Sequence, residues 1–204
     1  MEIQDKKLYV LNLLCIFSVC SFLIFGNCKS NSKRYFNNTG GESMLPVNST
    51  DSIAKQFNQL KEAIIKGEKN RIKLYFDFPI NNSDFWYKVL DDDEVDSYID
   101  KPFIEKDFYN YYDRIFTKEF KVCLSSVNVG ILSKKGAFRT PFLIDKGKKY
   151  FTKNQIYATC NQNELKLKFI SVVQDEIENG DHTEIYTFKL LKGKLKLVNF
   201  YMTD

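Results

Sequence analysis

The chain of 204 residues contains little of what most catalytic and metal-binding sites require. It has a single histidine, His182, no Cys-x-x-Cys pair and no cluster of cysteines and histidines, so a structural zinc site is excluded. The only glycine pair, Gly40-Gly41, is not followed by the lysine and hydroxyl residue of a phosphate-binding loop. We therefore expect no cofactor, no metal ion and no catalytic residue, which favours a protein that is not an enzyme.

Strong charge of one sign is also lacking. The net charge is +4, of which residues 29–50 carry +2 and residues 51–204 the other +2. A nucleic-acid-binding domain normally gathers a clear basic excess on one face, so nucleic acid is not an expected partner. The one acidic run, residues 91–96, lacks the glycine and the alternating ligands of a calcium loop and is interpreted as a solvated charge run.

Glycine and proline are scarce, at 9 and 4 residues, whereas 44% of the residues are hydrophobic and 15% are aromatic. This composition is typical of a packed globular protein and excludes a chain that is disordered throughout. At this length a single domain is expected, with room for a short targeting segment. We place that domain at residues 51–204.

The N-terminus has the pattern of a secretory signal. Residues 1–7 are polar with two lysines, residues 8–25 are almost wholly apolar, and a hydrophilic stretch follows Cys28. At Phe25-Gly26-Asn27-Cys28 the segment resembles the signal peptide of a bacterial lipoprotein. That resemblance implies a signal peptide over residues 1–27, a lipid such as palmitate on Cys28 and a flexible tether over residues 28–50.

The alternative is that residues 8–25 stay in place as a membrane helix, since 18 apolar residues are just enough to span a bilayer. Either arrangement holds the domain at a membrane, in the cell envelope, facing the periplasm or the cell surface. In such an oxidising compartment, Cys123 and Cys160 can form a disulfide. The other arrangement open to them is two buried free thiols.

Two helical patterns precede the strands. Four apolar residues recur at helical spacing before Gly67: Ile53, Phe57, Leu60 and Ile64. Residues 70–76 favour a second short helix, although their alternation suits a strand equally well. Residues 81–102, polar and acidic around Phe85-Trp86-Tyr87, predict a long surface loop.

Residues 105–120 predict a further helix with a nearly all-aromatic buried face. That face is the candidate lining of an apolar ligand pocket, or else simply core: Phe108, Tyr111, Tyr112, Ile115 and Phe116.

The last third of the chain changes to a period of two. Residues 155–160 and 164–170 alternate as strands do, Asn179-Gly180 predicts a tight turn before residues 185–188, and Lys192-Gly193 predicts another. His182 is then expected at an exposed hairpin tip. Helices followed by an antiparallel meander of about four strands predict an α+β fold.

The phrase Ala63-Ile64-Ile65-Lys66-Gly67-Glu68-Lys69, the Phe78-Pro79-Ile80 segment, the aromatic helix and the terminal meander together resemble exported proteins of Gram-negative bacteria. Those are similar to the cystatin-like cone of the nuclear transport factor two and SnoaL-like superfamily. The resemblance covers residues 53–204 and implies helices packed on a curved antiparallel sheet around a pocket. The superfamily hosts enzymes, binders and scaffolds alike, so the fold does not supply an activity.

Three functions fit these observations. The first is a non-catalytic, membrane-anchored lipoprotein that binds a small apolar ligand or a partner protein of the envelope. The second is a small pocket enzyme of the SnoaL-like kind, using carboxylates and tyrosines such as Tyr111 or Tyr112, which predicts an inward-facing acid beside a tyrosine hydroxyl. The third is an immunity-type lipoprotein that binds a toxin.

Overall fold

The computed structural model describes residues 49–146, 151–161, 163–174 and 179–203. All of them belong to one of the two compact units of the chain, Met44–Asp204. The predicted signal peptide, the lipid-bearing Cys28 and nearly all of the tether lie outside the described residues. Among the helices of the described residues, none combines the length and the apolar character needed to cross a membrane.

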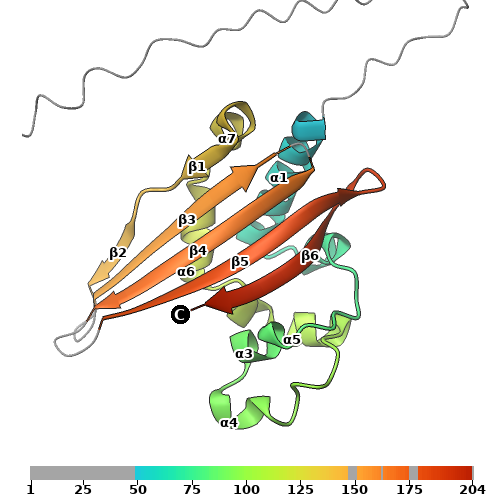
Figure 1. Cartoon of the computed structure of the whole chain (residues 1–204), viewed down its shortest axis with the longest axis vertical. Helices are drawn as coiled ribbons and strands as arrows, with labels where there is room; N and C mark the ends of the chain where they lie inside the picture. Colours follow the sequence, from blue (N-terminus) through green and yellow to red (C-terminus); the bar gives the residue numbers. More distant parts are fainter. Residues whose placement is uncertain (1–48, 147–150, 162, 175–178, 204) are drawn as a thin grey trace, which may run out of the picture. The chain divides into compact units, whose positions relative to one another are not determined.

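Seven α-helices and one short 3-10 helix occur in the described residues, and all precede the strands, as Figure 1 shows. Their bounds are α1 (Ser49–Lys66), α2 (Lys69–Ile72), η1 (Lys73–Tyr75), α3 (Asp84–Val89), α4 (Asp92–Val95), α5 (Glu105–Ile115), α6 (Lys118–Ser125) and α7 (Val129–Lys135).

The first helix was predicted correctly. The four apolar residues of its stripe are all buried, and Gly67 ends the helix with a φ of 69°. Glycine suits this position because it adopts positive φ without a steric penalty. Residues 70–75 are helical as well, divided between α2 and η1, and Phe76 is extended directly after them, so the predicted short helix forms and the strand alternative is excluded.

Two helix predictions need correction. Residues 81–102 are not a surface loop, because α3 and α4 form within them and Phe85 and Trp86 are completely buried. Residues 105–120 are not one helix, because α5 ends at Ile115 and α6 begins at Lys118. Thr117 caps α6 by accepting a hydrogen bond from the Phe120 amide at 3.2 Å, so a new helix axis begins there.

Six strands form one antiparallel sheet in the described residues. Their bounds are β1 (Ala137–Arg139), β2 (Leu143–Lys146), β3 (Phe151–Cys160), β4 (Glu164–Gln174), β5 (Asn179–Leu191) and β6 (Lys194–Thr203). The order is β1-β3-β4-β5-β6, and β2 pairs with β3 beyond the end of β1. The α+β prediction is confirmed, and the sheet is open, with two more strands than expected.

The turns were predicted with mixed success. Lys192 and Gly193, with φ of 49° and 76°, form the expected tight turn between β5 and β6. Asn179 and Gly180 do not form a turn: they are the first residues of β5 and pair with Gln174 and Val173 of β4. Consequently His182 lies within a strand and not at a hairpin tip.

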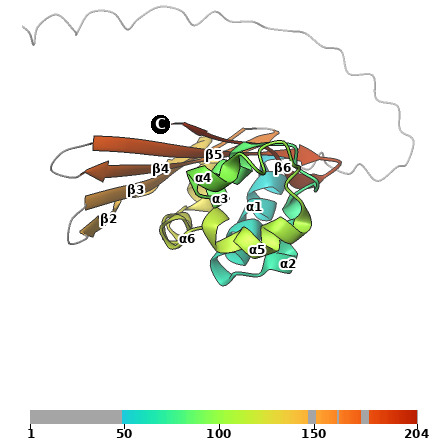
Figure 2. The same ribbon diagram turned by 90° about the horizontal axis from the view of Figure 1, so that it is seen from below.

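The helices gather on one face of the sheet, as Figure 2 shows. One continuous apolar core lies between the two layers and includes residues from α1 through β6. Aromatic rings join the layers: the Phe116 ring lies 6.1 Å from the Tyr186 ring, and Phe85 lies 4.7 Å from Phe200. Alternate residues of β5 supply Phe188, Tyr186 and Glu184 to this inner face.

Candidate functional site

The predicted pocket lining packs as core. Phe108, Tyr112, Ile115 and Phe116 are buried, and Tyr111 packs against the core from a partly exposed position. The Tyr112 hydroxyl donates to the Ile64 carbonyl at 2.9 Å, which ties α5 to α1. None of these five residues lines either of the two cavities described next.

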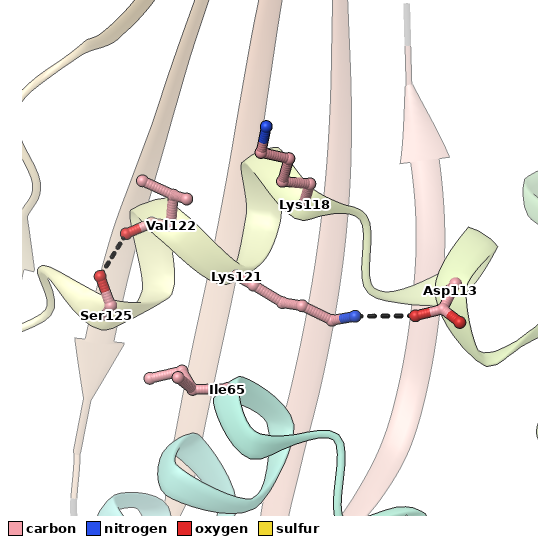
Figure 3. A pocket seen from close by; sticks show the side chains of 6 residues that line it. All are labelled: Ile65, Asp113, Lys118, Lys121, Val122 and Ser125. Atoms are coloured by element: carbon pink, nitrogen blue, oxygen red, sulfur yellow. Dashed lines mark hydrogen bonds and ion pairs between the residues drawn. The ribbon is translucent and has the colours of Figure 1, made fainter.

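A solvent-open groove lies on the helical layer, between the last turn of α1 and the helices α5 and α6 (Figure 3). Its volume is about 540 Å³, within the range of small-molecule sites. It is lined by Ile65, Asp113, Lys118, Lys121, Val122 and Ser125. Ile65 and Val122 expose 40% and 41% of their surface, so its apolar part is in contact with water.

The groove carries more positive than negative charge. The Lys121 ammonium lies 2.9 Å from the Asp113 carboxylate, and this hydrogen bond holds the pKa of Asp113 below its usual value. The field of Lys69 acts in the same direction. The ammonium groups of Lys69 and Lys121 lie 5.0 and 4.7 Å from the Tyr112 ring centroid. Lys118 forms no ion pair with any described residue, so a cation is available in the groove.

A second cavity lies at the free edge of β6. Its volume is about 270 Å³. One wall is formed by Asp77, residues 79–82 and Phe85, and the other by Leu197, Val198, Asn199 and Phe200. We call this cavity the edge cleft.

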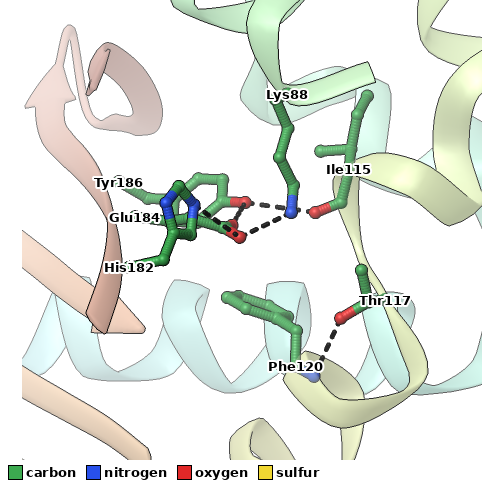
Figure 4. A network of polar contacts seen from close by, with 7 residues as sticks. All are labelled: Lys88, Ile115, Thr117, Phe120, His182, Glu184 and Tyr186. Carbon is green, nitrogen blue, oxygen red and sulfur yellow. Dashed lines mark hydrogen bonds and ion pairs between the residues drawn. The ribbon is translucent and has the colours of Figure 1, made fainter. Parts of the chain in front are cut away.

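A buried polar network joins the helices to the inner face of the sheet (Figure 4). The Lys88 ammonium of α3 lies 2.5 Å from Glu184 Oε1 of β5, and their side chains are 10% and 3% exposed. The Tyr186 hydroxyl lies 2.8 Å from Glu184 Oε2 and donates to that oxygen or to the Ile115 carbonyl at 3.1 Å. The network thus connects α3, the end of α5 and β5.

Burial acts to raise the pKa of Glu184, but the contacts with His182, Lys88 and Tyr186 outweigh it and hold that pKa below the usual value. Glu184 is therefore ionised at neutral pH. Burial, together with the Glu184 charge, raises the pKa of Tyr186 well above its usual value. The tyrosine accordingly stays protonated beside a carboxylate that Lys88 already neutralises.

The sequence predicted His182 at an exposed hairpin tip, but it lies within β5 with a partly exposed side chain. Its side chain is 39% exposed, and Nε2 lies 3.7 Å from Glu184 Oε1. The register places it opposite Ser171 of β4 on the inner face of the sheet. The single histidine therefore belongs to the rim of the buried network.

Cys123 and Cys160 are both buried free thiols, which is the second of the two arrangements considered. Burial raises the pKa of the Cys123 thiol to about 11, with a smaller contribution from Glu119, and burial also raises that of Cys160. Both thiols are therefore protonated at neutral pH and are poor nucleophiles. In the described ranges no three acidic, cysteine or histidine side chains gather as a metal site.

Sequence reasoning missed the ion pair and both cavities. The sequence predicts a loop at Lys88, and the strand that it predicts begins at residue 185, directly after Glu184. The signal for Glu184 was the two-residue period itself, since Glu184, Tyr186 and Phe188 share one face. The groove and the edge cleft had no signal because they are formed between elements distant in sequence.

Comparison of the chain with protein-family models, with curated proteins and with solved structures found no match.

Proposed function

We propose that this chain is a non-catalytic lipoprotein of the bacterial cell envelope, anchored through Cys28, whose domain binds a small apolar ligand or a partner protein. The observation that carries the proposal is the open groove with exposed Ile65 and Val122 at its surface. Exposed apolar side chains gathered in a concavity are typical of binding sites. Lys118 would favour a ligand or partner with an acidic group next to its apolar part.

The state of the polar side chains supports binding over catalysis. Glu184 is satisfied by Lys88 and Tyr186, and neither of them lines a described cavity. A general base needs access to a substrate proton and a pKa near the working pH, and Glu184 has neither. The two thiols are protonated, so they do not replace it.

The groove is tested by introducing a charge into it. In the Val122→Glu variant, binding of the apolar dye anilinonaphthalene sulfonate should fall at least tenfold, because a carboxylate would replace an apolar contact and repel the sulfonate. Val173→Glu is the matched control, because Val173 is similarly exposed at 39% and lies on β4, away from the groove. Equal dye binding by the wild type and both variants would remove the groove as the binding site.

The anchor is tested by the intact mass of the protein extracted from membranes, beside a Cys28→Ala variant. The proposal expects a chain that begins at Cys28 and carries acyl mass, and expects the variant to lack both. An unmodified mass that includes Met1 would instead make residues 8–25 a membrane helix. Native mass spectrometry of the same extract should show a bound small molecule or a partner, and absence of both would count against the function.

We further propose that the domain is a variant of the cystatin-like cone. Support comes from the order of elements, with an amphipathic helix, an aromatic helix and a terminal meander, and from the layer of helices against one face of the sheet. An experimental structure with a closed barrel or a flat two-layer sandwich would contradict this assignment.

A second candidate function is the pocket enzyme, favoured by one observation. The enzyme hypothesis predicted an inward-facing acid beside a tyrosine hydroxyl, and Glu184 lies 2.8 Å from the Tyr186 hydroxyl, although the tyrosines expected were Tyr111 and Tyr112. If this pair acts chemically, turnover of some member of a substrate panel should be lost in Glu184→Gln. The immunity-type alternative predicts a toxin as the partner, which co-purification with the wild type and not with Val122→Glu would identify.

A further inference from the structure

The free edge of β6 is closed at one end by a side chain that occupies the place of a neighbouring strand. In the described residues β6 is the last strand of the sheet, so its second edge has no strand beside it. At the start of β6, the Gln56 carboxamide of α1 donates to the Gly193 carbonyl at 3.0 Å and accepts from the Leu195 amide at 2.8 Å. These are two main-chain groups that an added strand would otherwise pair.

The other end of the edge is closed in the same way. The Asn82 carboxamide donates to the Phe200 carbonyl at 2.5 Å. The two closed positions, Leu195 and Phe200, are separated by about 17 Å of extended chain. The edge cleft opens onto the residues between them.

The backbone between the two closed ends faces the cleft. Because successive residues of a strand point their amide and carbonyl groups to opposite edges, Leu197 points these groups to the same side as Leu195, away from β5. Val198 is the extra residue of a bulge, since Thr187 pairs with Asn199 and Phe188 with Leu197. Val198 is also 41% exposed, so it is accessible to a partner.

The opposite wall of the cleft does not pair with β6. Ile80 uses its amide and its carbonyl in hydrogen bonds of 2.9 Å with Phe103, on the other side of its segment. Lys196 joins this wall to β6 through the Asp77 carboxylate at 2.6 Å and the Phe76 carbonyl at 3.3 Å. The wall is therefore held next to the strand while the edge between Leu195 and Phe200 stays open.

From this geometry we infer that the edge cleft accepts a short extended segment of a partner protein, which adds as a strand beside Leu197 and Val198. The two carboxamides limit the paired stretch to the four residues 196–199. Buried Leu197 and Phe85 at the base of the cleft favour an uncharged segment, because a charge placed there would lose its hydration. This mode of recognition takes its affinity from main-chain hydrogen bonds. The site is separate from the groove, so its failure and the failure of the proposed function are distinguishable.

The test uses the full chain, solubilised in detergent. The probe is the neutral peptide acetyl-Thr-Val-Thr-Val-Thr-amide, titrated into isotope-labelled protein and followed by amide chemical shifts. We expect saturable shifts centred on Leu197, Val198 and Asn199. The same peptide with N-methylated central residues has lost the main-chain donors of those residues and should bind at least tenfold more weakly.

Two variants complete the test. Leu197→Pro adds a rigid ring and removes the amide that points away from β5, and should abolish the shifts, whereas Leu197→Met keeps that amide and should keep them. If Leu197→Pro fails to fold, the N-methylated peptide alone decides. Equal binding of the methylated peptide, shifts centred on Val122 or on the outer face of the sheet, pairing of two copies of the chain through β6, or no saturable shift at all would each overturn the inference.

Discussion

Glu184 is an ionised carboxylate with almost no access to water, and it tolerates that position because three side chains surround it. The Lys88 ammonium compensates its charge, and the Tyr186 hydroxyl and the His182 ring approach its two oxygens. A buried ion pair of this kind is weak evidence of net stability, but removing one partner is costly because the other charge is left unpaired.

Removal of the Lys88 charge alone should therefore lower the free energy of unfolding more than removal of both charges does. We expect Lys88→Met to lower the free energy of unfolding by about 3–5 kcal/mol, measured by urea denaturation followed by circular dichroism. The double variant Lys88→Met with Glu184→Gln should recover a large part of that loss. If the double variant is less stable than Lys88→Met, the stability lost in Lys88→Met does not come from an unpaired charge on Glu184.

The lowered pKa of Glu184 makes stability depend on pH in a definite direction. A group with a lower pKa in the folded state contributes stability that is fully present above its unfolded pKa, about 4.3 for glutamate, and is lost as the pH falls through the folded pKa. Wild-type stability should thus fall below about pH 4 more steeply than that of Glu184→Gln. Asp113→Asn is the control at an exposed carboxylate, whose side chain is 78% exposed, and should flatten the profile less.

At the scale of elements, α6 and α7 each begin at a residue whose side chain caps the helix. Thr117 caps α6, and Asn128 caps α7 by accepting from the Ile131 amide at 2.9 Å. The cap at Thr117 also explains why a single aromatic stripe over residues 105–120 belongs to two helices. A helical period in the sequence does not reveal a change of axis, whereas a capping residue can.

The Thr117 cap gives a small but measurable effect. Thr117→Ala should lower the free energy of unfolding by about 1 kcal/mol, because the Phe120 amide loses its acceptor. Thr117→Ser keeps the hydroxyl and should stay within a few tenths of a kcal/mol of the wild type in the same urea titration. A Ser variant as unstable as the Ala variant would assign the effect to the lost methyl group.

Local patterns were sufficient for α1, for the β5–β6 turn and for the alternation of β3 and β4. They failed where tertiary packing decided the outcome. Phe85 and Trp86 are buried by contacts with Phe103 and Phe200, which are distant in sequence. A local pattern contains no information on such contacts, so it did not predict the helix that forms around the two rings. The Asn179-Gly180 pair matched a turn signal, but strand pairing with Gln174 and Val173 extends through it.

At the scale of the molecule, one core connects both layers of the described residues, and no disulfide among these residues supports it. A bridge between Cys123 and Cys160 would have contributed about 3–4 kcal/mol through the loop it closes. Since both thiols are free, dithiothreitol should leave the urea midpoint of residues 44–204 unchanged. A lower midpoint in the presence of the reductant would reveal a bridge that forms in solution.

The chain's only tryptophan is Trp86 of α3, which is 1% exposed and donates its indole N–H to the Lys101 carbonyl at 2.7 Å. Fluorescence excited at tryptophan-specific wavelengths comes from this one position, so it reports on the surroundings of α3 alone. The emission should be blue-shifted and shielded from iodide in the native protein. Since Lys88 lies on the same helix, loosening of the ion pair would be seen as iodide quenching while circular dichroism still reports an intact sheet.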